Sequence, residues 1–130
     1  MDPADLSALL PIIESPLLHL RVQSREVVLL TVEIWPSGSA AVRLAALDAE
    51  GGSADLEHAT GTAPFHNLRV RIRDEDGFEY PPRAAVWGRS GNEWRGDWFF
   101  TGRPSLPRTV AVSVATDDGH EIEHVVRVHS

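Results

Sequence analysis

The sequence predicts an all-β fold, an antiparallel sandwich of two sheets with seven or eight strands and one short helix at the N-terminus. The first observation is the strict alternation of aliphatic residues and arginines at residues 68–73, the period-two pattern of a half-buried strand. The second is a set of turn dipeptides, such as Asp76-Gly77, between β-branched stretches. The third is that residues 65–107 hold three of the four tryptophans and the only tyrosine, which marks them as the packed centre.

The length of 130 residues predicts a single domain. Residues 1–16 are expected to form an N-terminal helical or extended segment that packs on the domain. Residues 17–130 are expected to form the sandwich, with a flexible loop at residues 48–64. The apolar run at residues 6–13 is interrupted by Pro11 and has no basic residue before it, so it predicts neither a secretory signal nor a membrane anchor. The chain is therefore expected in the cytoplasm, without membrane contact.

The charge balance excludes several classes of partner and of enzyme. Twelve basic and nineteen acidic residues give a net charge of −7, which predicts no attraction for nucleic acid or anionic lipid. All the basic residues are arginine, so there is no lysine for a Schiff base or for a phosphate-binding loop. There is no cysteine, and hence no thiol nucleophile, disulfide or thiolate metal site. We expect no cofactor and no intrinsic catalysis.

The N-terminal helix is predicted from its start and stop signals. Asp2 is placed to cap the helix, and Pro3 occupies the first helical position. The helix is expected to run to about Leu10, because Pro11 and Pro16 each lack an amide donor and push the preceding residue toward extended geometry. An apolar stripe on this segment is expected to cover the core. The stripe consists of Leu6, Leu9, Leu10 and Ile13.

Strands are predicted where β-branched and aliphatic residues alternate with polar ones or run on without helix signals. They cover residues 17–23, 26–35, 40–47, 68–73, 94–100, 109–115 and 121–128. A further β segment follows Asp76-Gly77, and Asp118-Gly119 is the clearest hairpin signal in the chain. Strands at this spacing favour a two-sheet sandwich of immunoglobulin-like type over a closed barrel.

The strand at residues 26–35 is expected to be central in its sheet. Alternation places its even-numbered aliphatic residues on a wholly apolar face and Thr31 and Glu33 on the other face. The even-numbered set is Val28, Leu30, Val32 and Ile34.

One stretch near the C-terminus matches a catalytic pattern. Residues 120–124, His-Glu-Ile-Glu-His, fit the H-E-x-x-H pattern of zinc metalloproteases, in which two histidines on one helix face bind zinc and the glutamate is the general base. The flanking Asp-Gly turn and valine-rich segment predict a strand instead. In a strand the two histidines would lie roughly 13 Å apart, too far to share an ion held at about 2.1 Å from each nitrogen. A zinc hydrolase built on His120, Glu121 and His124 is the alternative function.

A row of arginines is the first candidate for binding a ligand or a partner. Arg69, Arg71 and Arg73 present guanidinium groups that suit a carboxylate or a phosphate. Pairing of this row with Glu121 and Glu123 on a neighbouring strand is the favoured explanation, because the two rows have the same period.

The acidic run at residues 74–76, together with Glu79, has the oxygen ligands that calcium prefers. The spacing of an EF-hand loop is absent, and a solvated hairpin tip is the favoured interpretation.

The tryptophans suggest a second kind of ligand, since exposed rings stack on sugars. Trp94 and Trp98 share parity with Phe100, which predicts that all three line the core side of one strand. Trp87 precedes a glycine-rich connection at residues 88–92 and is the candidate for an exposed ring. Core packing is the favoured explanation for these rings, and a carbohydrate-binding module is the second alternative function.

The same central stretch resembles a known group of domains. Residues 73–80 (RDEDGFEY), 94–100 (WRGDWFF) and the Leu106-Pro107 pair are similar to segments of uncharacterised bacterial, actinobacterial-like immunoglobulin-like domains. The resemblance covers about residues 65–115, and Phe78 stands where those domains carry a small residue. It implies a β-sandwich and no catalytic residues.

The sequence thus predicts a non-catalytic binding or protein–protein interaction module. A protein partner, or a second copy of the chain, is expected to bind through an exposed sheet edge. The candidate contact residues are Arg69, Arg71, Arg73 and Trp87. No metal, nucleic acid or membrane is expected to bind.

Overall fold

The structure is a computed structural model that describes residues 11–22, 25–47, 65, 68–102, 107–117 and 119–128. The predicted helix to about Leu10 and the predicted loop at residues 48–64 lie outside these residues. The described residues form strands and turns, with no helix among them. Accordingly, this part of the chain has no helix long and apolar enough to cross a membrane.

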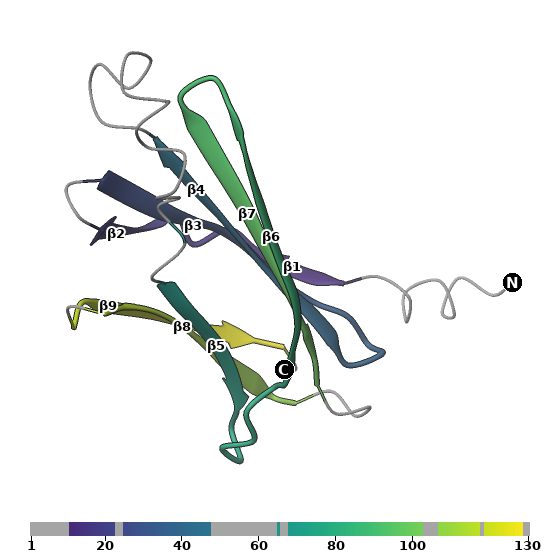
Figure 1. Cartoon of the computed structure of the whole chain (residues 1–130). Coiled ribbons are helices and arrows are strands. Elements are labelled where there is room, and N and C mark those ends of the chain that lie inside the picture. Colours follow the sequence, from purple (N-terminus) through teal and green to yellow (C-terminus); the bar gives the residue numbers. More distant parts are fainter. Residues whose placement is uncertain are drawn as a thin grey trace, which may run out of the picture.

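The described part of the chain contains nine strands (Figure 1). They are β1 (Ile12–Glu14), β2 (Leu18–Val22), β3 (Arg25–Ile34), β4 (Ser39–Leu47), β5 (Leu68–Asp74), β6 (Pro82–Ser90), β7 (Glu93–Thr101), β8 (Thr109–Thr116) and β9 (Glu121–Arg127). The predicted all-β fold is confirmed, but β1 was not predicted.

Strand β1 changes the environment expected for Ile13. The sequence places Ile13 on a helical stripe that covers the core, whereas its side chain is 56% exposed. In the extended β1, neighbouring side chains point to opposite faces. Ile12 therefore packs against the core, and Ile13 points away from it.

The strands form two antiparallel sheets, which Figure 1 shows lying one above the other. The larger sheet has the order β1-β3-β4-β7-β6, and β2 also pairs with β3. Strands β1 and β2 share one edge of β3, since β2 pairs with its first half and β1 with its last three residues. The smaller sheet has the order β5-β8-β9.

The strand order is that of an immunoglobulin-like domain. With β3 taken as strand A, the larger sheet reads A-B-E-D along β3-β4-β7-β6, and the smaller sheet reads C-F-G along β5-β8-β9. This four-on-three arrangement is the constant-type immunoglobulin order. Strands β1 and β2 are additions to the free edge of strand A.

One hydrophobic core lies between the sheets and takes side chains from both. Leu29 and Val42 of the larger sheet and Ile72 and Val112 of the smaller sheet are fully buried in it. Trp94, Trp98 and Phe100 all face this core, as their shared parity predicts.

The face assignment predicted for β3 is wrong in its first half. The register of β3 against β4 shifts between Leu29 and Thr31, so Leu30 is the extra residue of a β-bulge. Val27 and Leu29 face the core before the bulge, and Val32 and Ile34 face it afterwards. Every side chain before the bulge therefore lies on the face opposite to the one that simple alternation predicts.

Candidate functional site

The exposed strand β6 is the first candidate surface. Among the described residues β6 pairs with β7 alone, so it forms one end of the larger sheet. Except for Arg89, which is half-buried, its side chains are exposed on both faces. The smaller sheet therefore does not cover β6. Val86 is 60% exposed on one face and Trp87 is 37% exposed on the other.

Trp87, a predicted candidate residue, lies at the border between core and solvent. Its strand register places it opposite Gly96 of β7. The ring centroid of Trp87 lies 6.0 Å from that of the buried Trp98 and 6.4 Å from that of Phe65. Part of the ring is therefore packed in an aromatic cluster, while the remainder faces solvent. The predicted glycine-rich connection begins later than expected, because Gly88 still belongs to β6 and the turn is at Gly91-Asn92.

The predicted arginine row lies on the outer face of the smaller sheet. Arg69, Arg71 and Arg73 of β5 are all exposed, and Glu121 and Glu123 of β9 are exposed on the same face. The predicted pairing of these rows on neighbouring strands is wrong, because β8 lies between β5 and β9.

The ion pairs of the described residues differ accordingly from the prediction. Arg71 pairs with Glu79, at 3.3 Å between Nη2 and Oε1. Within the described part of the chain, Arg69, Arg73, Glu121 and Glu123 form no ion pair. The structure thus brings the two rows to one face but leaves them apart.

The acidic turn after β5 uses its carboxylates for local hydrogen bonds. Asp74 Oδ1 accepts hydrogen bonds from the backbone N–H groups of Asp76 (2.9 Å) and Phe78 (3.0 Å). The carboxylate of Glu75 accepts hydrogen bonds from the backbone N–H groups of Arg108 (3.1 Å) and Thr109 (3.2 Å). These bonds, the one from Arg108 foremost, lower the pKa of Glu75 below its ordinary value. The turn is thereby attached to the start of β8.

Residues 121–124 of the histidine pattern lie on a strand, as predicted, and His120 directly precedes that strand. His124 belongs to β9, and its Nε2 lies 2.8 Å from Glu14 Oε1 of β1. His120 closes the preceding turn: its backbone N–H donates to Thr116 Oγ1 at 3.1 Å, and its carbonyl accepts from the Thr116 N–H at 2.8 Å. Among the described residues, no group of three or more histidine or acidic side chains is placed to hold a metal ion.

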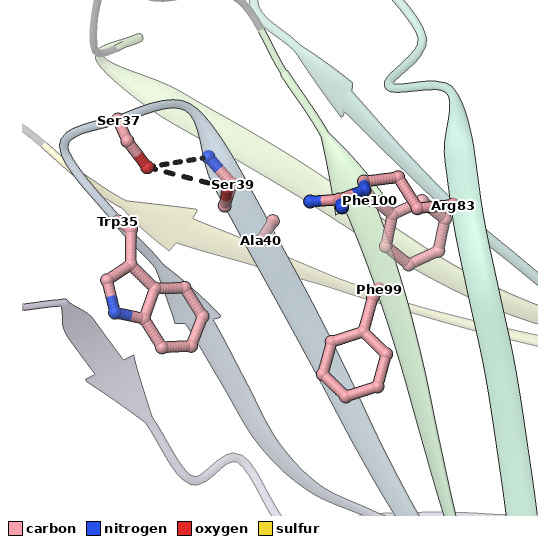
Figure 2. Close-up of a pocket in the computed structure, with 7 residues that line it drawn as sticks. All are labelled: Trp35, Ser37, Ser39, Ala40, Arg83, Phe99 and Phe100. Carbon is pink, nitrogen blue, oxygen red and sulfur yellow. Dashed lines mark hydrogen bonds between the residues drawn. The ribbon is translucent and has the colours of Figure 1, made fainter.

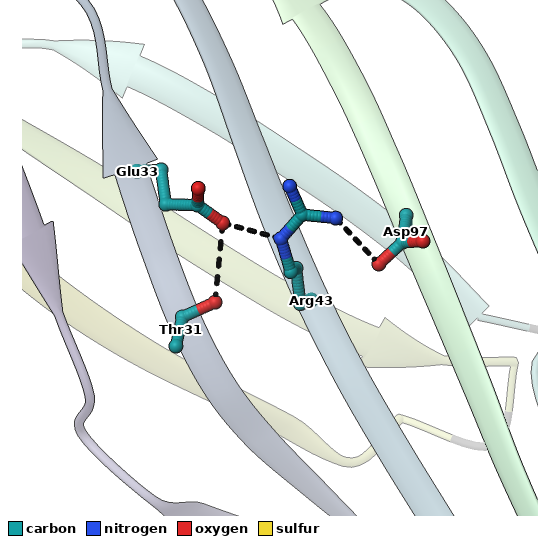
Figure 3. Close-up of polar contacts among 4 residues, drawn as sticks. All are labelled: Thr31, Glu33, Arg43 and Asp97. Carbon is teal, nitrogen blue, oxygen red and sulfur yellow. Dashed lines mark hydrogen bonds and ion pairs between the residues drawn. The ribbon is translucent and has the colours of Figure 1, made fainter. Parts of the chain in front are cut away.

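The larger sheet carries an ionic cluster that the sequence analysis did not identify (Figure 3). Arg43 of β4 hydrogen-bonds Glu33 of β3 through Nε and pairs with Asp97 of β7 at 2.9 Å through Nη1. Thr31 Oγ1 donates a hydrogen bond of 3.4 Å to the same Glu33 oxygen. The hydrogen bond to Glu33, and after it the one to Asp97, raises the pKa of Arg43 above its ordinary value against the effect of burial. Because Glu33 is only 12% exposed, this cluster joins three strands rather than offering a charge to a ligand.

A shallow hollow of about 270 Å³ opens beside this cluster. Figure 2 shows the rings of Trp35 and Phe99 on either side of β4, with the Arg83 guanidinium pointing toward that strand. Ser37 and Ser39 complete its polar lining. The only sequence signal for this hollow is the aromatic Trp35 directly before the turn at residues 36–38, and the prediction did not use it.

Two solved structures are similar to the chain. The crystal structure of a conserved domain protein from Bacillus anthracis matches at a TM-score of 0.50 and 8% identity, covering 92% of this chain and 50% of that chain. The crystal structure of bovine butyrophilin matches at a TM-score of 0.46 and 11% identity, covering 86% and 46%. The chain thus spans about half the length of each. The likeness to the first supports the fold alone.

No protein-family model matches the chain, and no curated protein matches it. The family-level resemblance of residues 65–115 to bacterial immunoglobulin-like domains therefore stays a prediction.

Proposed function

We propose that this chain is a non-catalytic protein-interaction module that binds an extended segment of a partner protein along the free edge of β6. The observation that carries the proposal is the exposure of β6 (Pro82–Ser90), a nine-residue strand that pairs on one edge only among the described residues. The free edge of such a strand presents a row of backbone donors and acceptors, which an added strand satisfies.

The composition of β6 supports this proposal. Sheet edges are commonly protected by charged side chains, proline, bulges or short length. In β6 the proline and the register irregularity lie at the start, between Pro82 and Ala84, and the arginines lie near the two ends. The middle, residues 84–88, is the uncharged sequence Ala-Ala-Val-Trp-Gly. A partner strand here would contact Val86 on one face and Trp87 on the other. Because neighbouring strand residues point to opposite faces, apolar residues at adjacent positions are expected in the partner.

Selection of short random peptides displayed on phage tests the proposal. We expect enriched peptides that carry apolar residues at adjacent positions, one for each face of the strand. We also expect their binding to slow amide hydrogen exchange at residues 84–88. Val86→Lys should weaken the binding of these peptides at least about tenfold, because a charge on an edge strand opposes strand addition.

The matched control is Val125→Lys, since Val125 is an exposed valine on β9 at an edge of the smaller sheet. It should leave peptide binding unchanged. The proposal is wrong if no peptide is enriched, if exchange slows outside β6, or if the two lysine variants weaken binding equally.

The zinc hydrolase and carbohydrate alternatives stay predictions. Zinc analysis of protein purified without a histidine tag tests the first. Tryptophan fluorescence titration with a panel of glycans tests the second.

A further inference from the structure

The outer face of the smaller sheet, which we call the charged face, has its charges sorted by strand. Arg69, Arg71 and Arg73 project from β5 along one side, and Glu121 and Glu123 project from β9 along the other. The central strand β8 contributes only small or uncharged side chains to this face: Thr109, Ala111, Ser113 and Ala115.

The strand register aligns these side chains in rows across the sheet. Arg69 lies opposite Ala115, which lies opposite Glu121. In the next row Arg71, Ser113 and Glu123 are aligned in the same way. Neighbouring strands are about 4.8 Å apart, so each arginine and glutamate of a row start roughly 10 Å apart on either side of β8. A hollow of about 290 Å³, with Arg73, Ser113 and Glu123 among its lining residues, lies between the two sides.

The order of charges reverses at the far end of the face. Arg127 of β9 lies opposite Thr109 of β8. On the β5 side of this row, the Glu75 carboxylate lies 3.2 Å from the Thr109 backbone nitrogen. This row therefore has its acid on the β5 side and its arginine on the β9 side, opposite to the first two rows.

We propose that the charged face binds a second copy of this chain, with the two-fold axis running along β8. A rotation about an axis parallel to the strands places β5 of one copy over β9 of the other. It also places each row of one copy over the same row of the other copy. A two-fold axis across the strands would instead place β5 over β5 and arginine over arginine. Charge complementarity thus selects one of the two symmetric arrangements.

In this dimer three of the four rows meet a row of complementary charge. Arg69 faces Glu121 of the second copy, and Arg71 faces Glu123 of the second copy. The row with the reversed order of charges is also complementary to itself, since Glu75 of one copy faces Arg127 of the other. Each contact occurs twice, because the interface of a two-fold dimer is self-complementary.

The remaining row is apolar on one side. Arg73 faces Val125 of the second copy, and Val125 is 54% exposed in the single chain. The aliphatic stem of Arg73 can cover this valine while its guanidinium stays in water. The small side chains of β8 leave room for the two faces to approach.

The size of the face predicts a weak dimer. Seven residues of β8 at about 3.3 Å each, and three strands about 4.8 Å apart, span roughly 23 by 14 Å. This area is well below the roughly 800 Å² per partner that stable complexes bury. The dimer is therefore expected to depend on protein concentration, and to weaken at high salt because exposed charges are screened.

Sedimentation velocity over a series of protein concentrations, at low and at physiological salt, tests the proposal. Glu121→Arg with Glu123→Arg makes both sides of the face basic, and Arg69→Glu with Arg71→Glu makes both sides acidic. Each double variant should raise the dissociation constant of the dimer at least about tenfold. An equimolar mixture of the two should restore association as a heterodimer, since the acidic face then meets the basic one.

Net charge provides a matched control. The Glu121→Arg, Glu123→Arg variant changes the net charge of −7 by four, to −3, which by itself would reduce repulsion between copies. Glu26→Arg with Glu93→Arg, on exposed positions of the larger sheet, changes the net charge equally and should leave the dimer intact. Circular dichroism confirms that each variant is folded. The proposal is overturned if the wild-type chain stays monomeric, if the mixture does not associate, or if the control variant dissociates as readily.

Discussion

Gly96 is the residue on which the aromatic cluster beside β6 depends. A Cβ atom at this position would lie 2.6 Å from Cζ3 of Trp98 and 3.1 Å from Cδ2 of Phe65. Both of those rings are buried, and Trp87 packs against them from the neighbouring strand. The absence of a side chain at Gly96 therefore lets the three rings pack together over β7.

Gly96→Ala is expected to destabilise the protein by about 1–3 kcal/mol, the usual cost of overpacking a core. Urea unfolding followed by tryptophan fluorescence measures the change. Gly88→Ala is the control, because a Cβ atom at Gly88 meets nothing within 4 Å. It should change the free energy of unfolding by no more than about 0.5 kcal/mol. Equal stability of the two variants would show that the rings adjust freely around Gly96.

At the scale of single elements, the turn that follows β5 is connected to the start of β8, the neighbouring strand of the smaller sheet. Glu75 supplies this connection through its hydrogen bonds from Arg108 and Thr109. These bonds hold the pKa of Glu75 below its ordinary 4.5. A carboxyl with a lowered folded-state pKa stabilises the folded state above its unfolded-state pKa, and this contribution is lost as pH falls through the folded-state value.

The backbone amide signals of Arg108 and Thr109 should therefore stay constant above about pH 5 and shift together at more acidic pH. Nuclear magnetic resonance at a series of pH values measures this. In Glu75→Gln the same two amides should show no titration. Titration that persists in Glu75→Gln would assign the effect to another carboxyl.

At the scale of the whole molecule, the two sheets share one core while all four tryptophans follow or belong to strands of the larger sheet. Tryptophan fluorescence thus reports on side chains of the larger sheet and on the shared core that Trp94 and Trp98 face. Because the core side chains of β8 pack between the sheets, a loss of packing on the smaller sheet should destabilise both sheets. Small single domains commonly unfold in one cooperative step.

Val112→Ala tests this coupling, since Val112 of β8 is fully buried. We expect a loss of about 1–3 kcal/mol, with equal shifts of the urea midpoint in tryptophan fluorescence and in far-ultraviolet circular dichroism. Val125→Ala, an exposed position on β9, should change the midpoint little in dilute solution. If Val112→Ala leaves the urea midpoint of tryptophan fluorescence unchanged, the two sheets unfold independently.

The strands and turns were predictable because their signals are local. The alternation at residues 68–73 and 109–115 depends only on neighbouring residues, and β5 and β8 lie where it predicts. The Asp76-Gly77 turn is present with Gly77 at φ 84°, a conformation that glycine adopts without strain. These features made the all-β fold and most of its strands readable from the sequence.

The candidate surfaces depended on tertiary structure. The bulge at Leu30 reversed the predicted faces in half of β3, because one extra residue without a partner on β4 shifts the alternation by one position. Trp35 and Phe99 are far apart in the sequence, and only the pairing of β3, β4 and β7 gathers them at one hollow.

The period of the arginine and glutamate rows, and the side of each strand on which they lie, can be read from the amino-acid sequence. That β8 separates the two rows, and that both rows face outward from the smaller sheet, follows from the folded arrangement of the strands. Alternation is a property of one strand, whereas the order of strands follows from which long-range pairings bury the most apolar surface. That order turned two charged rows expected to neutralise each other within one chain into a face that is complementary to itself.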